Sequence, residues 1–161
     1  MPVLCLPFVF CLPTMTEPIT LRPLTADDYP AFLDLMRATP GVVVRDADAP
    51  EAVARYLARN PGLSFLACAG ERPVGGLLAG HDGRRGYLNH LLVHPDFRGR
   101  GIARTLVDRA LVALGEAGIG KTHLDVLESN AAGQSFWTAL GWQPRDDLRR
   151  YSCTHNGGAN A

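Results

Sequence analysis

The feature that most constrains the fold is one segment, Leu91–Val107, whose sequence is LLVHPDFRGRGIARTLV. It opens with an apolar run, passes through a proline, places three arginines around two glycines, and then resumes an apolar rhythm. An apolar run before a Pro and Gly cluster favours a buried strand, and apolar residues three and four positions apart favour a helix. That helical spacing is carried by Ile102, Leu106, Val107, Ala110, Leu111 and Leu114. We therefore expect a strand, a tight loop and a helix in direct succession.

The glycines and arginines of this loop predict an anion-binding site. Gly99 and Gly101 allow the backbone to approach a ligand closely or to adopt positive φ. A helix that begins near Gly101 presents unpaired N–H groups at the positive end of its dipole. Arg98, Arg100 and Arg104 add guanidinium donors, and the combination suits a phosphate or pyrophosphate. A glycine-rich turn with solvated arginines is the plainer alternative.

Two familiar phosphate motifs do not match the loop. A P-loop requires a lysine followed by Ser or Thr after its last glycine, whereas Ile102 and Ala103 follow Gly101 here. A dinucleotide fingerprint requires a third small residue at the position that Arg104 occupies. The first motif is excluded, and the second fits poorly.

The pattern that fits is Arg-x-x-Gly-x-Ala, formed by Arg98, Gly101 and Ala103. In this the chain resembles the GCN5-related N-acetyltransferase (GNAT) superfamily, whose signature for the pyrophosphate of coenzyme A is Gln/Arg-x-x-Gly-x-Gly/Ala. The segment LDVLESNAAGQSFWTALGW resembles the superfamily's later strand and helix, and ITLRPLTADDYPAFLDL resembles its opening. The resemblance covers roughly residues 18 to 152, and the arrangement is most similar to that of ribosomal-protein N-terminal acetyltransferases.

The remaining sequence predicts a mixed α/β (α+β) fold with a largely antiparallel central sheet and helices on both faces. We expect strands at residues 19–24, 63–70, 74–82, 85–93, 122–128 and near 148–153. We expect helices from Ala26 to about Arg37 with Thr25 as N-cap, over 50–59, from about 101, and over 131–140. The resemblance implies that the fourth and fifth strands splay apart and that the pantetheine arm of the cofactor lies between them.

Length and composition bound the alternatives. A chain of 161 residues with 47% hydrophobic residues can bury one sizeable core, so residues 15–153 are expected to form a single domain. Sixteen basic and sixteen acidic residues cancel, which gives no electrostatic reason to expect nucleic acid or a membrane as a partner. The four cysteines show no metal-ligand spacing, so we expect no metal and a cytoplasmic location.

The two ends of the chain are expected to stand outside this domain. Residues 1–14 are apolar, but they lack a basic residue before the apolar run, contain Pro7 and are too short to span a bilayer. Met15 begins the segment at which a member of the superfamily would start, so we interpret residues 1–14 as an extension or a misassigned start. Residues 154–161 are expected to form a loose tail.

The resemblance implies acetyl-CoA as co-substrate and an amine acceptor of unknown identity, for a monomer or a homodimer. The cofactor would be held by Leu91, Leu92, Val93, Arg98, Gly99, Arg100, Gly101, Ile102, Ala103, Arg104, Asn130 and Trp137. Acetyl transfer requires a neutral amine, a stabilised oxyanion and a leaving thiolate. The resemblance places the oxyanion at backbone N–H groups of residues 91–93, which the splay leaves unpaired.

Three residues are candidates for receiving the proton of the amine. Asp125 is the first, because it stands where the ribosomal-protein acetyltransferases have a Glu twelve residues before a catalytic Tyr; a strand-end carboxylate that stabilises a turn is the alternative. Tyr87 and His90, on the facing strand, are alternative bases or substrate-lining residues.

Trp137 departs from the superfamily pattern Asn-x-x-Ala-x-x-x-Tyr, in which Asn130 fills the first position and Gly133 stands in place of the Ala. An indole N–H does not ionise in the useful range, so it cannot replace a tyrosine as general acid, although it can pack against the cofactor. A thiol with a pKa of about 8.5 leaves tolerably as thiolate, so the loss slows the reaction without forbidding it. Asn130 is expected either to bind the pantetheine or to cap a helix.

These observations predict an acetyl-CoA-dependent N-acetyltransferase that moves an acetyl group to a primary amine of a small molecule or protein by direct attack. A catalytically weak CoA-binding sensor or interaction module is the alternative, because of Trp137. An enzyme that uses a longer acyl-CoA is the third possibility and would require more room beside residues 91–93.

Overall fold

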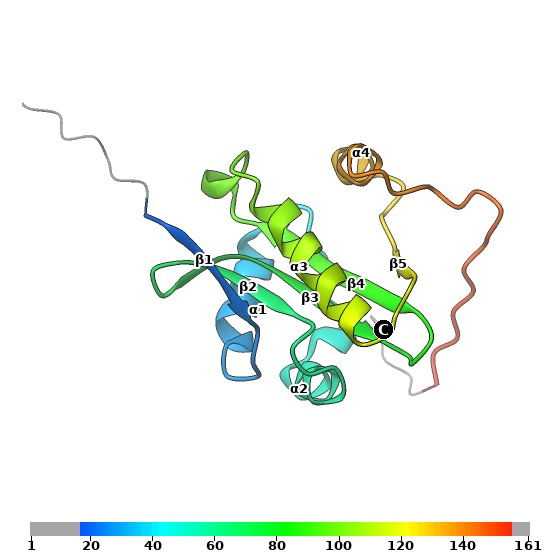
Figure 1. The fold of residues 1–161 in the computed structure, drawn as a ribbon, viewed down its shortest axis with the longest axis horizontal. Coiled ribbons are helices and arrows are strands. Elements are labelled where there is room, and N and C mark those ends of the chain that lie inside the picture. Colours follow the sequence, from blue (N-terminus) through cyan, green and yellow to red (C-terminus); the bar gives the residue numbers. More distant parts are fainter. Residues whose placement is uncertain (1–16, 156–161) are drawn as a thin grey trace, which may run out of the picture.

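The computed structural model describes residues 17–155, which contain a five-stranded sheet in the order β1-β2-β3-β4-β5 (Figure 1). The strands are β1 (Ile19–Pro23), β2 (Phe65–Ala69), β3 (Arg72–His81), β4 (Gly86–Val93) and β5 (Thr122–Leu124). Neighbouring strands from β1 to β4 pair antiparallel, and β5 pairs parallel with β4. The helices are α1 (Tyr29–Ala38), α2 (Pro50–Arg59), α3 (Ile102–Glu116) and α4 (Ala131–Ala139), with short 3₁₀ turns η1 (Asp46–Asp48) and η2 (Pro95–Phe97).

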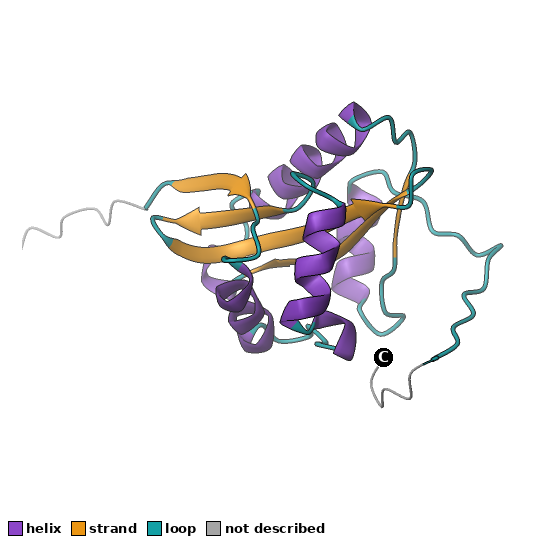
Figure 2. Cartoon of the chain, turned by 90° about the horizontal axis from the view of Figure 1, so that it is seen from below, coloured by secondary structure: helices purple, strands orange, loops and turns teal. Residues whose placement is uncertain are grey.

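Helices cover both faces of this sheet, as the sequence predicts (Figures 1 and 2). On one face, α1 and α2 pack their apolar side chains, among them Phe32 and Leu57, against Leu66 and Leu78 of the sheet. On the other face, α3 packs Leu106 and Leu114 in a second buried cluster. The mixed α/β class, the largely antiparallel sheet and the helices on both faces are therefore confirmed, and the crossover through α3 makes β5 parallel to β4.

Most predicted elements form close to their expected bounds. The second helix occupies Pro50–Arg59, and the helix after the glycine-arginine loop begins at Ile102 with Gly101 as its N-cap. The first helix begins at Tyr29, three residues later than predicted from Ala26, and its N-cap residue is Asp28 rather than Thr25. The reason is that the Asp28 carboxylate accepts hydrogen bonds from the Thr25 N–H and hydroxyl, which holds the intervening residues in a turn.

Two strand predictions at the end of the chain are wrong. The fifth strand was expected over 122–128, but β5 ends at Leu124 and the chain then leaves the sheet. The strand expected near 148–153 does not form in the described part of the chain, where Leu148 and Tyr151 are exposed on an irregular segment. Because β5 has only three residues, it provides few backbone groups with which a sixth strand could pair.

Strand β4 contains one extra residue relative to β3. Gly76 faces Leu92 and Leu78 faces Asn89, so two residues, His90 and Leu91, lie opposite Leu77 alone. His90 has φ +51°, and it is the one non-glycine residue with positive φ among residues 17–155. This β-bulge places strain at the middle of the strand that borders the splay.

The splay between β4 and β5 follows directly from their pairing. The register runs from Gly86 opposite Thr122 to Leu88 opposite Leu124, and no pairing of the two strands continues beyond it in the described residues. Figure 1 shows β5 turning away from β4 toward α4, while α3 stays against the sheet. The gap therefore opens at the carboxyl ends of the two strands, between α3 and α4.

The predictions for residues 1–14 lie outside the described residues, as does most of the tail predicted over 154–161. Within residues 17–155, no helix has the length and apolar character needed to cross a bilayer.

Candidate functional site

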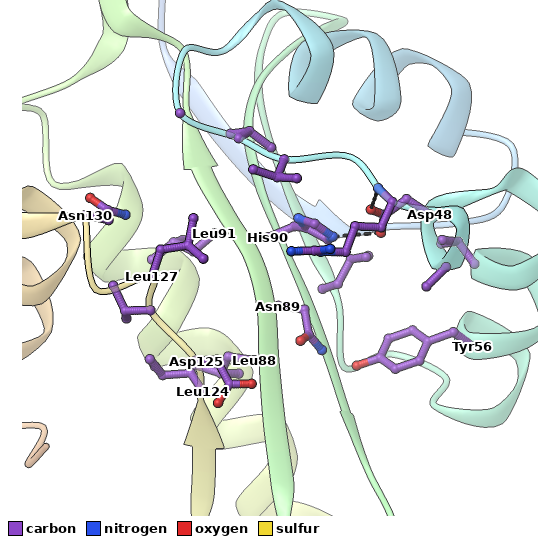
Figure 3. Close-up of a pocket in the computed structure, with 18 of the residues that line it drawn as sticks. Asp48, Tyr56, Leu88, Asn89, His90, Leu91, Leu124, Asp125, Leu127 and Asn130 are labelled. Carbon is purple, nitrogen blue, oxygen red and sulfur yellow. Dashed lines mark hydrogen bonds and ion pairs between the residues drawn. The ribbon is translucent and has the colours of Figure 1, made fainter. Parts of the chain in front are cut away.

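A cavity of about 590 Å³ lies where β4 and β5 diverge (Figure 3). One wall comes from residues 41–48 and from α2, and the opposite wall comes from the chain that follows β5 and from α4. Residues 88–91 of β4 run between the two walls. Figure 3 shows Leu91, Leu127 and Asn130 on one side of β4, and Asp48, Tyr56 and Asn89 on the other. The cavity therefore connects the two faces of the sheet through the splay.

The backbone of β4 presents N–H groups to this gap. The His94 N–H donates to the Val74 carbonyl of the β3 edge, at 2.8 Å. Because N–H groups alternate in direction along a strand, the Leu92 N–H also points to β3, and those of Leu91 and Val93 point to the other side. That side is where β5 has already diverged. The gap thus has two backbone donors at the positions where the sequence predicts an oxyanion site.

The glycine-arginine loop lies at the same end of β4 and leads into α3. Gly99 and Gly101 have φ +74° and +75°, which L side chains rarely adopt. No side chain caps the first turn of α3, so its N–H groups remain available to a ligand. The Nε of Arg98 donates to the Val93 carbonyl at 3.1 Å and fixes the loop to the strand end.

The other two arginines of the loop have different neighbours. The Arg100 guanidinium lies 4.9 Å from the centre of the Phe97 ring. Arg104 forms a loose pair with Asp108, with 4.0 Å between nitrogen and oxygen, and both side chains are exposed. Both guanidinium groups therefore lie near the start of α3 without a close carboxylate partner, which leaves them able to turn toward an anion.

Asp125, the first candidate for the base, lines the cavity just beyond the end of β5. Its carboxylate is paired with the guanidinium of Arg150, and their side chains are 61% and 65% exposed, respectively. The pair joins the irregular C-terminal segment to the wall of the cavity. A carboxylate in such a pair gives up an ion-pair partner when it binds a proton.

His90 and Tyr87, the two alternatives, lie in different surroundings. The Nε2 of His90 lies 2.7 Å from Oδ1 of Asp48, whose side chain is only 7% exposed. The other oxygen of Asp48 accepts the Arg45 N–H, also at 2.7 Å. Both His90 and Asp48 line the cavity, whereas Tyr87 does not and its ring lies 6.1 Å from that of His123. The structure thus brings His90 into the site with a buried carboxylate and leaves Tyr87 at its margin.

Asn130 and Trp137 stand on the opposite wall. The side-chain oxygen of Asn130 accepts the Gly133 N–H at 2.9 Å, so it caps α4, one of the two roles expected for it. The ring of Trp137 packs edge-on against Phe136 and Trp142, with centres 5.1 and 5.0 Å away. Trp137 also lines the cavity, which makes it part of an aromatic cluster that forms this wall.

Among the cavity residues that sequence reasoning missed are Asp48, Tyr56 and Arg150. Each comes from a segment distant from β4 along the chain; Asp48 and His90, for example, are 42 residues apart. Tyr56 carries a weak local signal, since it lies on the same face of α2 as Val53, three residues earlier. In the part of the chain that the structure describes, no group of three or more metal-ligating side chains occurs.

Comparison with known proteins agrees with this geometry. Residues 29–142 match the model of the acetyltransferase (GNAT) family. An acetyltransferase of Pectobacterium atrosepticum is 35% identical over 127 residues, which cover 78% of this chain and 89% of the relative.

Among solved structures, an aminoglycoside N-acetyltransferase in complex with CoA matches with a TM-score of 0.70 and 22% identity, over 88% of this chain and 99% of the other. A ribosomal-protein-alanine N-acetyltransferase from Brucella melitensis matches with a TM-score of 0.66 and 22% identity, over 85% and 99%. At these identities the two structures establish the fold alone. The family model and the curated relative go further, and they show that this chain belongs to the acetyltransferase (GNAT) family.

Proposed function

We propose that the protein transfers the acetyl group of acetyl-CoA to a primary amine by direct attack. The observation that carries this proposal is the cavity itself, which passes from the side of β4 with His90 and the buried Asp48, through the gap between β4 and β5, to the side with Leu127, Asn130 and Trp137. The uncapped start of α3 follows the end of β4 on that second side. Two substrates can thus approach one point from opposite faces of the sheet, as a direct transfer requires.

The cofactor would use the face that carries α3 and α4. Its pyrophosphate is anionic and suits the start of α3, where N–H groups, positive dipole and the arginines at 98, 100 and 104 come together. Its pantetheine arm would follow the gap between β4 and β5, along Leu91 and toward Trp137. The thioester carbonyl would then lie near the N–H groups of Leu91 and Val93, which suit the oxyanion of a tetrahedral intermediate.

In the reaction, the amine nitrogen attacks the thioester carbon and its positive charge grows as the C–N bond forms. The C–S bond then breaks, CoA leaves as thiolate, and one proton of the nitrogen passes to a base. We assign that base to His90. If the Nε2–H of His90 donates to Asp48, its Nδ1 carries the lone pair, and the buried carboxylate stabilises the imidazolium that forms. Asp48 is a positioning residue in this scheme.

Asp125 remains the competing base, because it also lines the cavity. Its ion pair with Arg150 is the reason for ranking it second: protonation of the carboxylate removes that interaction. The alternative for Asp125 is a structural role, in which its pair with Arg150 joins the end of β5 to the C-terminal segment.

The test is release of free CoA from acetyl-CoA with a panel of primary amines, with the acetylated product identified by mass. We expect amine-dependent CoA release and an N-acetyl product. CoA binding without turnover on any amine would favour the alternative, a CoA-binding module, which the missing phenol at Trp137 supports. The known acceptors of structural relatives, an aminoglycoside and a ribosomal protein by their names, justify including both amino sugars and peptide amino termini in the panel.

A further inference from the structure

One hydroxyl in the cavity has no partner. Among buried side-chain polar atoms of residues 17–155, the Tyr56 oxygen alone has no hydrogen bond. Burial raises the pKa of the Tyr56 hydroxyl, and a weak interaction with the Asn89 side chain, which does not reach the geometry of a hydrogen bond, lowers it in part. The hydroxyl therefore keeps its proton at neutral pH and remains a donor. Buried polar groups in folded proteins are normally paired, so this exception requires an explanation.

The fold holds this hydroxyl in place and prevents it from finding another partner. Tyr56 extends from α2 toward β3, where Gly80 has no side chain; a Cβ built at Gly80 would lie only 2.6 Å from the hydroxyl. The amide of Asn60 stands beside the same point, but its Nδ2 donates to the Tyr56 carbonyl at 3.1 Å and its Oδ1 accepts the His81 N–H at 2.9 Å. The missing Cβ of Gly80 thus creates the space that the phenol occupies.

Tyr56 lines the cavity, although its hydroxyl oxygen has almost no accessible surface in the free protein. Figure 3 shows Tyr56 and Asn89 pointing toward one another from α2 and β4, on the same side of β4 as His90. The Asn89 residue is exposed and brings one further amide donor and acceptor to the same place. A ligand group could pair with the hydroxyl once the exposed Asn89 side chain rotates aside, and the Asn89 amide would then be a second partner for that group.

The surroundings indicate an uncharged ligand group. Val53 lies three residues before Tyr56 on the same face of α2, and Leu78 lies opposite Asn89 across the β3–β4 ladder; both are buried. A charged group beside these apolar side chains would lose hydration without gaining a counter-ion next to it. A hydroxyl or an amide carbonyl can pair with both Tyr56 and Asn89 at no such cost.

We propose that Tyr56 and Asn89 form a recognition subsite for a hydroxyl or amide carbonyl carried by the acceptor amine. The proposal rests on the proposed function, because His90 on the same side of β4 is where the amine would react. It defines the acceptors as primary amines with an uncharged hydrogen-bonding group a few bonds from the nitrogen, such as amino alcohols, amino sugars and peptide amino termini. A site built to pair with such a group discriminates against an analogue that lacks it.

The experiment compares matched acceptors on the wild type and on Tyr56→Phe. The pairs are 2-aminoethanol with propylamine, 3-aminopropanol with butylamine, and glycinamide with propylamine. We compare kcat/KM per neutral amine, because the amines differ in pKa and hence in the neutral fraction that can attack, and we expect wild type to prefer the polar member of at least one pair by tenfold or more on this scale. Tyr56→Phe should bring that ratio to within about twofold of one by lowering the value for the polar member. Equal values for both members of every pair on the wild type would overturn the proposal.

A kinetic split distinguishes recognition from chemistry. A fall in kcat that is the same for both members of a pair would show that the hydroxyl acts on the reacting atoms, and the subsite would be wrong. If no amine is acetylated at all, the proposed function fails instead. The subsite is then judged by calorimetric binding of the same pairs in the presence of CoA, where a preference lost in Tyr56→Phe supports it and equal binding overturns it.

The free protein offers a second readout that does not depend on turnover. Because the Tyr56 hydroxyl has no partner, Tyr56→Phe should leave the thermal midpoint of the free protein unchanged or higher. Tyr29→Phe is the matched control, since the Tyr29 hydroxyl donates to the buried Asp48 carbonyl at 2.7 Å, and this variant should lower the midpoint. A loss for Tyr56→Phe as large as that for Tyr29→Phe would reveal a structural partner and overturn the proposal.

Discussion

At the scale of single residues, the site depends on contacts between side chains that are far apart in sequence. The buried Asp48 reaches His90 across 42 residues, and the strained backbone of His90 presents its imidazole to the cavity. Strain of this kind persists where the surrounding structure fixes it, and it is concentrated at functional sites.

His90→Gln tests the proton acceptor. We expect kcat at pH 7 to fall by about 10²-fold or more, since general-base catalysis contributes 10²–10⁴-fold. The loss should be smaller at pH 9 for an α-amine with a pKa of about 8, because most of that amine is already neutral there. Steady-state kinetics at the two pH values measure the effect.

Two further variants complete this comparison. Asp125→Asn should lower kcat less than His90→Gln does at pH 7; the opposite order would return the role of base to Asp125. Asp147→Asn is the matched control, because Asp147 also forms an exposed pair with an arginine, Arg145, but does not line the cavity. It should leave the kinetics unchanged at both pH values.

Substitutions at Trp137 test whether the absence of a tyrosine hydroxyl at this position affects the release of CoA. If CoA leaves as an unassisted thiolate, Trp137→Tyr should retain or raise kcat, because it supplies a proton donor at the position where the family has one. Trp137→Ala removes a ring that contacts Phe136 and Trp142. Since the ring is only partly buried, we expect a loss of roughly 2 kcal/mol in unfolding free energy, below the 3–5 kcal/mol of a fully buried ring. A tenfold fall in kcat for Trp137→Tyr with unchanged CoA affinity would contradict the leaving-group account.

Asp28 predicts how stability changes with pH. Hydrogen bonds from Arg22 at 2.6 and 2.7 Å, and from Thr25, hold the pKa of Asp28 well below its usual range. A depressed carboxyl pKa contributes stability above the unfolded value near 4, and this contribution is lost as the pH falls. Asp28→Asn should therefore reduce the free energy of unfolding at pH 7, and the difference from wild type should shrink below about pH 4.

Urea unfolding at pH 7, 5, 4 and 3 measures this dependence. Asp34→Asn is the control, because Asp34 makes only an exposed pair with Arg37 at 3.5 Å. It should change stability little at any of these pH values. A constant difference between Asp28→Asn and wild type across the series would show that the Asp28 carboxylate does not carry the pH dependence.

At the scale of elements, the start of α3 is the part of the site that depends on local sequence. Gly101 has φ +75° and a Cβ built there meets no atom within 4 Å, so the position has room but disfavours an L side chain. We expect Gly101→Val to abolish detectable CoA binding by calorimetry, because its side chain and the altered backbone would occupy the space proposed for the pyrophosphate.

Gly118→Val is the matched control for Gly101→Val. Gly118 follows the other end of α3, has φ +81° and likewise has an open Cβ position. Both substitutions should cost a similar 1–3 kcal/mol of backbone strain, but only Gly101→Val should lose CoA affinity. Unchanged affinity in Gly101→Val would place the pyrophosphate elsewhere.

The elements that could be predicted are those that short local sequence patterns determine. Helix α2, the antiparallel strands β2 to β4 and the loop before α3 follow from patterns within a few residues, and they form close to the predicted bounds. The strand predictions beyond Leu124 are wrong, because alternating apolar residues indicate which side chains are buried but do not indicate whether a neighbouring strand is available for pairing. Residues 125–127 satisfy that pattern by lining the cavity instead.

The candidate site likewise has a part that could be predicted from the sequence and a part that could not. The cofactor loop could be predicted because its glycines, arginines and helix start are adjacent in sequence. Asp48 and Tyr56 could not, because their roles depend on packing α2 and η1 against β4, and no local pattern encodes that contact. His90 was identified only as an alternative base, since its hydrogen bond to Asp48 exists only in the folded chain.

At the scale of the whole molecule, the proposed cofactor would connect elements that share few contacts. Helix α4 and β5 join the rest through a three-residue ladder and through partly buried side chains, Leu124, Trp137 and Leu140, whereas α3 packs along β2, β3 and β4. A ligand bound across the gap should therefore stabilise the native state as a unit. Acetyl-CoA at about 100 times its Kd should add about 2.7 kcal/mol. This corresponds to a rise of roughly 5–10 °C in Tm for a chain of this size.

Thermal unfolding with and without acetyl-CoA measures this effect, and Gly101→Val supplies the control that should show no shift. Hydrogen exchange adds the spatial information: protection should increase most in residues 122–139. Stabilisation without any added protection in that segment would show that the cofactor does not bridge the gap.

The extra residue in β4 also determines which changes the gene can accept at this point. Before the bulge, Leu88 packs on the α3 face; after it, Leu92 packs on the α1–α2 face and Val93 on the α3 face again. Because two residues, His90 and Leu91, lie opposite Leu77, deleting one residue at this point would restore a regular strand and leave Leu92 and Val93 in their present layers, whereas a deletion elsewhere in β4 would turn the side chains beyond it to the opposite layer. The bulge is therefore the one point in β4 where the packing of the sheet tolerates the loss of a residue, and such a loss would mainly remove the positive-φ backbone conformation of His90.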